Sequence, residues 1–275
     1  MTYIDPMLSY PLYQAVILAL VQGLTEFLPI SSTGHLILAN AFFGFTGEFA
    51  NTFDMVIQFG AILAVIAYFR KKIFPFGKGK TPDEKKATWD LWKKAAVGVI
   101  PAVIVGFTFG KRLQEALFNP YVVALALIVG GIALLVIERK KRPIRIDSLA
   151  ALTYKTAFLI GLVQCLSFIP GTSRSAATII GAMLLGASRL VATEFSFYLA
   201  IPTLAGASAY SLYKSGIALN GNELTLLAIG FVVSFFAAWA VIGAFMDYVS
   251  KKDFKAFGYY RIILGAIVLA YYAMR

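Results

Sequence analysis

Residues Val21–His35 read VQGLTEFLPISSTGH, and residues Val163–Ser175 read VQCLSFIPGTSRS. Both stretches run from a Val-Gln pair to a proline and then to a cluster of Gly, Ser and Thr, and the second lacks one residue of the first. Both lie within strongly apolar sequence. In a membrane protein, an ionisable side chain flanked by apolar residues marks a candidate functional site. The repeated pattern therefore predicts a duplicated chain in which the two copies meet at one site.

The composition places the chain among multi-pass membrane proteins. Hydrophobic residues make up 59% of the sequence and charged residues only 14%, whereas soluble domains contain about 25% charged residues. The net charge of +11 raises the question of nucleic-acid binding, but the basic residues lie in loops beside apolar segments and form no groove-reading motif. We interpret them as a topology signal that also contacts anionic membrane lipids. Because Cys165 is the only cysteine, an intramolecular disulfide and a thiol-bound metal cluster are excluded.

Two of the apolar segments are too short to cross a membrane. A spanning helix needs about 20 residues, and the segments at 33–44 and 173–186 fall short of that length. Each follows a motif proline, Pro29 or Pro170, and proline removes a backbone donor and disfavours helix in the preceding residue. Each motif is therefore predicted to form a helix, a break and a half-helix. The apolar segments lie near residues 11–29, 33–44, 53–69, 92–110, 120–137, 154–169, 173–186, 191–213, 223–247 and 258–274.

The basic residues indicate whether these broken units cross the membrane. Cytoplasmic loops carry an excess of Lys and Arg, so we place the basic loop 70–94 inside, and the loop 138–155, two spans later, also lies inside. If the unit around Pro170 enters and returns on that side, Arg189 and the basic cluster 251–261 lie inside too. A single crossing would put that cluster outside, so the second unit is predicted to be re-entrant. The basic residues left outside are Lys111, Arg112, Lys214 and Arg275.

Repeat symmetry extends this arrangement to the first unit. Gly44 corresponds to Gly186, and Phe53, in a Phe53-Asp54 turn, corresponds to Phe195 beside Glu194, with the same separation in both pairs. The first unit is then re-entrant from outside, the N-terminus lies outside, and the second half is inserted upside down. We predict an all-α polytopic membrane protein with an inverted-topology repeat of about five helices per half. It has six full spans and two re-entrant helix–break–helix hairpins that meet near the midplane. The single membrane domain covers residues 1–275, with repeat halves of about 1–145 and 146–275.

The two breaks are predicted to form an anion site. Each half-helix begins at a cluster of small polar residues, and a helix N-terminus offers free N–H groups and the positive end of a dipole. Arg174 adds a planar guanidinium group suited to phosphate. Glu26 adds a negative charge, which fits either a divalent cation that bridges it to phosphate oxygens or a carboxylate that orients His35 or a water molecule.

Structural explanations compete with these functional ones. His35 has roughly even odds of a functional role, because it is a lone histidine near a helix start but lies in a membrane. A Ser-Ser-Thr-Gly cluster is most often an N-cap, Arg174 and Glu26 would form a buried structural pair, and Gln22 would pack between helices. Asp54 and Glu194 begin predicted helices, so capping or dipole roles weigh equally with a supporting role at the site.

Two motifs resemble those of a known family. The stretch Gln22–His35 resembles the (E/Q)xxxE-plus-PxSSTGH region of the bacterial undecaprenyl-diphosphate phosphatases, the bacitracin-resistance family. The stretch Pro170–Ser175 resembles that family's PGxSRS signature. The resemblance covers essentially the whole chain in length, span order and motif spacing, and two long motifs at this separation make it specific.

The resemblance implies a multi-pass enzyme of the bacterial inner (plasma) membrane whose active site opens to the outer face. It would remove the terminal phosphate from undecaprenyl diphosphate and so recycle the lipid carrier for cell-wall peptidoglycan synthesis. It also implies a divalent cation, Mg²⁺ or Ca²⁺, as cofactor.

The family pattern assigns roles to individual residues. Glu26 would serve metal binding or acid–base chemistry, Ser32 and His35 are both candidates for nucleophile or proton donor, and Arg174 would clamp the diphosphate. Gln22 stands where many members have glutamate, and its neutral amide supplies no charge to a metal. The candidate catalytic residues are Glu26, Ser32, His35 and Arg174; the candidate substrate-binding residues are Ser31, Thr33, Gly34, Gly171, Thr172, Ser173 and Ser175; and the candidate supporting residues are Gln22, Asp54 and Glu194.

Two other classes of protein share parts of this pattern. Inverted repeats with midplane sites are typical of transporters, so a polyprenyl-phosphate flippase or transporter is the main alternative to a phosphatase. A scaffold membrane protein is a third, in which Glu26 and Arg174 serve folding alone. The expected partners are a polyprenyl diphosphate and membrane lipids, with no nucleic acid, and the sequence leaves monomer and homodimer both open.

Overall fold

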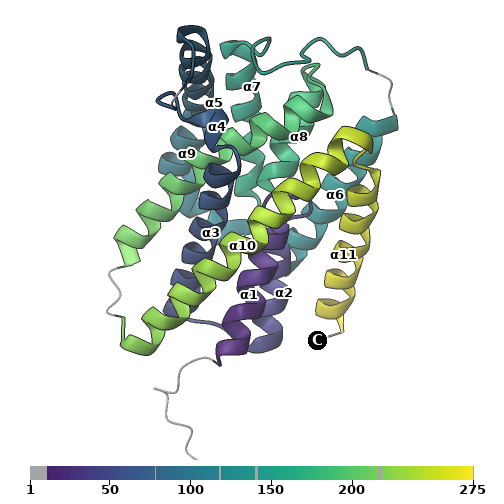
Figure 1. Cartoon of the computed structure of the whole chain (residues 1–275). Coiled ribbons are helices and arrows are strands. Elements are labelled where there is room, and N and C mark those ends of the chain that lie inside the picture. The colour runs from purple at the N-terminus through teal and green to yellow at the C-terminus, as the bar shows by residue number, and fades with distance from the viewer. Residues whose placement is uncertain (1–10, 78, 118, 140–141, 216–218, 275) are drawn as a thin grey trace, which may run out of the picture.

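The structure is a computed structural model, and it describes residues 11–77, 79–117, 119–139, 142–215 and 219–274 (Figure 1). Helices are the regular elements of this part of the chain, which has no named strand. They are α1 (Leu12–Thr25), α2 (Ser32–Phe43), α3 (Glu48–Tyr68), α4 (Arg70–Ile73), α5 (Pro82–Leu117), α6 (Pro120–Arg139), α7 (Tyr154–Gln164), the 3₁₀ helix η1 (Cys165–Phe168), α8 (Arg174–Leu184), α9 (Arg189–Ser215), α10 (Gly221–Lys251) and α11 (Lys255–Ala273).

Six of the described helices, α3, α5, α6, α9, α10 and α11, are long and apolar enough to cross a membrane. This confirms an all-helical, multi-pass membrane protein. The predicted turn at Phe53-Asp54 is wrong, because α3 begins at Glu48 and carries both residues inside the helix. The sequence predicts a helix start at the acidic Asp54, whereas the helix begins at Glu48, after the positive-φ residue Gly47.

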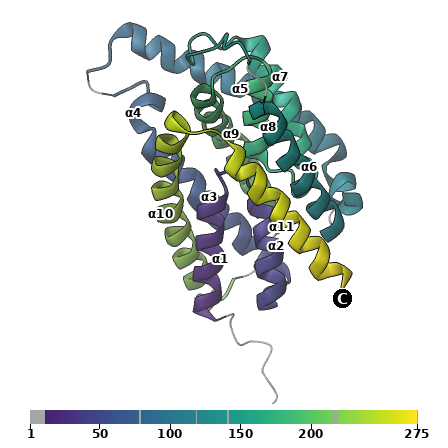
Figure 2. The same cartoon turned by 90° about the vertical axis from the view of Figure 1, so that its right-hand side faces the viewer.

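The short helices α1, α2, α7 and α8 form two pairs, each of which returns toward its own starting end. Near the start of α1, the side-chain Nε2 of Gln14 donates to the carbonyl oxygen of Phe43 at the end of α2, at 3.4 Å. After α8, the carbonyl oxygen of Gly186 accepts from the amides of Arg145 and Ile146, which precede α7, at 2.8 and 3.0 Å. In both views α1 and α2 lie in the lower part of the bundle and α7 and α8 in the upper part (Figures 1 and 2).

The basic loops gather at the upper end of the bundle in Figure 1. Glu138 at the end of α6 accepts from Arg189 at the start of α9 (2.8 Å) and from the backbone amide of Phe254 before α11 (3.1 Å). Lys94 donates to the carbonyl oxygen of Leu149 at 3.2 Å, which brings the start of α5 to the same end. The grouping agrees with the predicted charge asymmetry. The predictions for the N-terminus and for Lys78, Lys140, Lys141, Lys214 and Arg275 lie outside the described residues and side chains.

The spans pack closely because small residues line their contacts. α6 lies along α11 and α3 lies along α10. An added Cβ at Gly131 would lie 2.7 Å from the carbonyl oxygen of Gly258, so this pair of glycines sets the α6–α11 distance. Within the first break, Phe27 packs edge-on against Phe197 of α9, with ring centroids 5.4 Å apart. The first break is thereby anchored on a buried aromatic core.

Candidate active site

Both broken units change direction at a serine with a strained backbone. Ser31 has φ 74° and Ser173 has φ 69°, and these are the non-glycine residues with positive φ in the described part of the chain. Each serine is the N-cap of a half-helix: Ser31 Oγ accepts from the amide of Gly34 and Ser173 Oγ from that of Ala176, both at 3.2 Å. Such conformations cost about 1–3 kcal/mol each and cluster at functional sites. The predicted breaks therefore carry matched, strained caps.

The two N-cap serines give a more exact alignment of the two motifs than the sequence comparison does. Ser31 and Ser173 both immediately precede a half-helix, so Ser32 in the first unit occupies the position of Arg174 in the second. Compared with the first unit, the second has one residue fewer before its proline and one more after it. The hydroxyl and the guanidinium group thus start equivalent helices.

Glu26, Ser32 and Arg174 form the polar centre of the site. Oε2 of Glu26 accepts from Ser32 Oγ at 2.7 Å and from Gln22 Nε2 at 2.9 Å. Oε1 of Glu26 lies 3.9 Å from Arg174 Nη2, which is an ion pair but too long for a hydrogen bond. Glu26 is 6% exposed and Arg174 is 9% exposed. The buried Gln22 of α1 therefore holds the carboxylate of Glu26, which caps the end of that helix.

Arg174 has donors that no protein group satisfies. Its Nη1 donates to the carbonyl oxygen of Ser196 at 3.0 Å, but its buried Nε and Nη2 have no hydrogen-bond partner. Leaving a buried charged donor unsatisfied costs more than 1–3 kcal/mol by rough estimate. The free edge of the guanidinium group is thus set to receive an anion in the geometry that suits phosphate oxygens.

The remaining candidates divide between the site and its support. The fully buried Ser175 donates to the carbonyl oxygen of Leu28 at 2.8 Å, so its hydroxyl joins the two breaks. The Gly34 amide is taken by the Ser31 cap. Thr33 is exposed at the start of α2. Gly171 has φ +90° and lies against the backbone of Val123 in α6.

His35 is held at both ring nitrogens. Nδ1 lies 2.7 Å from the carbonyl oxygen of Ser31 and Nε2 lies 2.7 Å from the hydroxyl of Tyr260, whose ring stacks on the imidazole. A carbonyl can only accept, so Nδ1 carries a proton and, in the neutral ring, Nε2 accepts from Tyr260. The nitrogen that would attack phosphorus is therefore occupied, whereas the hydroxyl of Ser32 faces a carboxylate.

Arg261 joins the two breaks, and its position differs from the predicted one. It was counted among the cytoplasmic basic cluster, but it lies inside α11 and is fully buried. Its guanidinium group donates to the carbonyl oxygen of Pro29 at 3.2 Å and to those of Gly171 and Thr172 at 3.0 Å. It also donates to the α6 carbonyl oxygens of Ala126 and Leu127. One side chain therefore connects both breaks. Its role could have been suspected from the sequence, because a cation within the apolar segment 258–274 marks a candidate functional residue.

Replacing Arg261 with Met should destabilise the folded protein strongly. The change leaves several buried carbonyls without a donor, each worth about 1–3 kcal/mol. The midpoint of thermal unfolding in detergent should fall well below that of the wild type, with a smaller fall for Arg261→Lys. Arg112→Met, at an exposed arginine, is the matched control. A wild-type midpoint for Arg261→Met would show that these contacts contribute little.

Asp54 and Glu194 are neither helix caps nor members of the central cluster. Their helices begin earlier, at Glu48 and Arg189, so the predicted capping role is wrong. Asp54 accepts from Asn40 Nδ2 at 3.1 Å, and Glu194 accepts from Lys72 and from the hydroxyl of Tyr198. The structure thus pairs each carboxylate with a neighbouring helix.

Asp54→Asn and Glu194→Gln should reduce turnover less than Glu26→Gln does. Neither carboxylate touches Ser32 or Arg174, so we expect losses of about tenfold or less. Steady-state phosphate release by the three variants, measured side by side at equal folded protein, tests this ranking. Equal losses in all three would place Asp54 and Glu194 in the reaction.

A metal ion would find few protein ligands here. In the described part of the chain no group of three or more His, Cys, Asp and Glu side chains is arranged to hold one. Glu26 supplies a single carboxylate beside the free edge of Arg174. This donor set fits Mg²⁺ bound by one carboxylate and substrate phosphates, the usual arrangement for that ion.

Comparison with known proteins identifies a family whose sequence model matches most of the chain. Residues 15–267 match the family model described as bacitracin resistance protein BacA. The chain is 51% identical over 263 residues to undecaprenyl-diphosphatase 1 of Clostridioides difficile (strain 630), covering 95% of this chain and 96% of that protein. It is 51% identical over 268 residues to the undecaprenyl-diphosphatase of Limosilactobacillus fermentum (95% and 97% covered) and 48% identical over 260 residues to undecaprenyl-diphosphatase 2 of Rhodospirillum rubrum (94% of each).

Proposed function

The chain belongs to the bacitracin resistance protein BacA family, and we propose that this membrane undecaprenyl-diphosphatase hydrolyses its substrate where the α1–α2 and α7–α8 breaks meet. The products are undecaprenyl phosphate and inorganic phosphate. The observation that carries the choice of site is the free edge of Arg174, a buried guanidinium group with two unsatisfied nitrogens.

The terminal phosphate binds between the starts of α2 and α8. Both helices offer first-turn N–H groups and positive dipole ends to this space, and Arg174 presents its unsatisfied nitrogens from α8. The contact from Ser175 to the carbonyl oxygen of Leu28, at 2.8 Å, keeps the two helix starts close together. Phosphoryl transfer depends mainly on positioning and charge neutralisation, and these groups supply both.

Ser32 is the nucleophile and Glu26 is its general base. The 2.7 Å hydrogen bond directs the proton of Ser32 Oγ toward Glu26, so the oxygen can attack the terminal phosphorus as that proton passes to the carboxylate. Undecaprenyl phosphate leaves, and water then hydrolyses the phosphoserine to release phosphate. His35, the alternative nucleophile, has its acceptor nitrogen engaged by Tyr260, which favours a positioning role for the imidazole.

A divalent cation, Mg²⁺ or Ca²⁺, binds together with the diphosphate. Glu26 would hold it, and when bound it neutralises charge on the phosphate oxygens. The other ligands come from the substrate and water, because Glu26 is the one carboxylate paired with Arg174 among the residues that the structure describes. Binding of the cation is therefore expected to depend on the diphosphate.

The two halves form an inverted repeat with re-entrant hairpins. Corresponding helices make corresponding contacts: α3 packs on α10 as α9 packs on α5, and α1 packs on α10 as α7 packs on α5. The first hairpin approaches from the end opposite the basic loops, and the second from the basic end. The positive-inside rule then places the start of α1 and the first hairpin on the outer side of the bacterial plasma membrane. Thr33 and His35 retain solvent exposure there, which favours a site that opens outward.

Phosphate release by the purified protein tests the proposed function. In detergent, a polyprenyl diphosphate and Mg²⁺ should yield inorganic phosphate. Detergent micelles have no two sides, so a protein that only flips lipid would release none. No release, with substrate binding retained, would overturn the proposal in favour of transport.

A further inference from the structure

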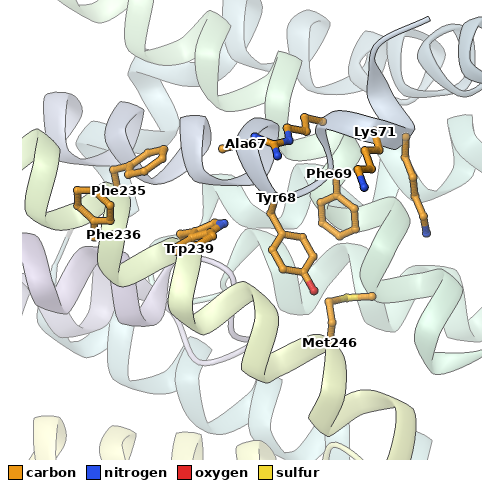
Figure 3. Close-up of a pocket in the computed structure, with 10 residues that line it drawn as sticks. Ala67, Tyr68, Phe69, Lys71, Phe235, Phe236, Trp239 and Met246 are labelled. Atoms are coloured by element: carbon orange, nitrogen blue, oxygen red, sulfur yellow. The ribbon is translucent and has the colours of Figure 1, made fainter. Parts of the chain in front are cut away.

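A groove separates the α3–α4 corner from α10 on the surface of the bundle (Figure 3). It has a volume of about 720 Å³. Phe235, Phe236, Trp239 and Met246 line it from α10, and Tyr68 and Phe69 line it from α3 and the corner. It contains none of the residues of the candidate active site, so it is a separate feature of the molecule.

The walls of the groove are apolar and face outward. Tyr68 is 39% exposed, Phe236 is 58% exposed and Trp239 is 49% exposed. They lie on α3 and α10, two helices that can span a membrane, so their exposed surfaces meet lipid and not water. Aromatic side chains of this kind concentrate where the acyl region gives way to headgroups. The groove is thus suited to an acyl chain beside an interface.

Three consecutive cations close one end of the groove. Arg70, Lys71 and Lys72 form the short helix α4 and line the cavity. Lys72 is paired with Glu194, whereas Arg70 and Lys71 are exposed and have no ion-pair partner among the described residues. The buried Ile73 fixes α4 against the core. Two uncompensated positive charges are therefore held at the end of an apolar channel.

We propose that this groove binds one anionic phospholipid of the surrounding membrane. The phosphate of the headgroup lies against Arg70 and Lys71, and an acyl chain runs along Tyr68 and Trp239. The charge selects an anionic lipid, because each Lys or Arg near the membrane surface strengthens such binding. The apolar walls select a lipid over a soluble anion. Because α4 belongs to the basic loops, the lipid comes from the leaflet on that side.

Native mass spectrometry of the full chain in detergent tests this site. Phosphatidylglycerol, the probe, should bind as one tight copy per protein, and phosphatidylcholine should bind at least about tenfold more weakly. The double variant Arg70→Gln/Lys71→Gln should lose tenfold or more in affinity for phosphatidylglycerol. Trp239→Ala should weaken both lipids alike, because it removes only apolar surface.

Matched variants separate a specific site from general attraction. Lys85→Gln/Lys86→Gln removes the same charge from exposed positions of α5 that do not line the groove, and it should leave phosphatidylglycerol binding within about twofold of the wild type. Arg70→Lys/Lys71→Arg keeps the charge and should keep the lipid. Three outcomes would each overturn the proposal. They are equal losses of phosphatidylglycerol affinity in the two Gln double variants, equal affinity for the two phospholipids, and displacement of the bound lipid by a polyprenyl phosphate alone. Phosphate release without added lipid should be unchanged in all these variants, which also reports that they are folded.

Discussion

Arg174→Lys is expected to reduce turnover by roughly 100-fold or more while changing stability little. Lysine keeps the positive charge and can still reach the carbonyl oxygen of Ser196, which Arg174 now contacts at 3.0 Å. It cannot reproduce the planar edge formed by Nε and Nη2, the two nitrogens that are buried without partners. A group that is unsatisfied in the free protein gains most when the phosphate arrives, so its loss should affect catalysis more than folding.

The measurement is phosphate release at saturating substrate, together with the midpoint of thermal unfolding in detergent. Arg112→Lys, at an exposed arginine of α5, makes the same chemical change away from the site and should leave both quantities unchanged. Wild-type turnover in Arg174→Lys would remove Arg174 from the site. A large fall in the unfolding midpoint would instead favour a structural ion pair with Glu26.

Two buried arginines show how the same group serves different purposes. Every nitrogen of Arg261 donates to backbone carbonyls, including those of Pro29 and Gly171. Arg174 makes its close hydrogen bonds through a single nitrogen, to Ser196, and leaves the others free. Satisfied donors add rigidity, and unsatisfied donors retain binding capacity. Arg261 therefore holds the two breaks together, whereas Arg174 keeps donors that a ligand can use.

Local sequence carried enough information to predict the helix plan. Pro29 and Pro170 restrict the backbone at the two breaks whatever surrounds them, and the length of an apolar segment limits whether it can span. The six long helices and the short helices α1, α2, α7 and α8 follow from these local properties, whereas α4 and η1 were not predicted. The adjacency of the two motifs was also predictable, because irregular backbone within a membrane must be buried or line a wet cavity.

The sequence did not reveal contacts that depend on distant backbone. Arg261 is satisfied by carbonyls of three separate segments. Every residue has a carbonyl, so the sequence cannot indicate which residues are its partners. Tyr260 meets His35 only because α11 passes α2. Asp54 and Glu194 resemble caps by position along the chain, but Asn40 and Lys72 reach them from other elements. Such partners are set by packing and not by local pattern.

Ser32→Ala should lower turnover roughly 1,000-fold or more, because it removes the proposed nucleophile. The small hydroxyl contributes one hydrogen bond to Glu26, and its loss should cost only about 1 kcal/mol of stability. Ser250→Ala, at an exposed serine in α10, is the matched control and should behave as the wild type. Rapid quenching of the wild type should trap phosphate on Ser32.

Glu26→Gln should lower turnover to a similar extent, because an amide cannot take the proton from Ser32 Oγ. The side chain keeps its size and can still accept from Gln22, which lies 2.9 Å away, so binding of substrate should persist. If Ser32 and Glu26 act as one unit, the double variant should be no slower than the slower single variant. Losses that multiply would show that the two residues act independently. If the phosphoenzyme forms on His35 and Ser32→Ala stays active, the nucleophile is His35 and not Ser32. The hydrogen bond from Tyr260 to His35 Nε2 must then break before the imidazole can attack.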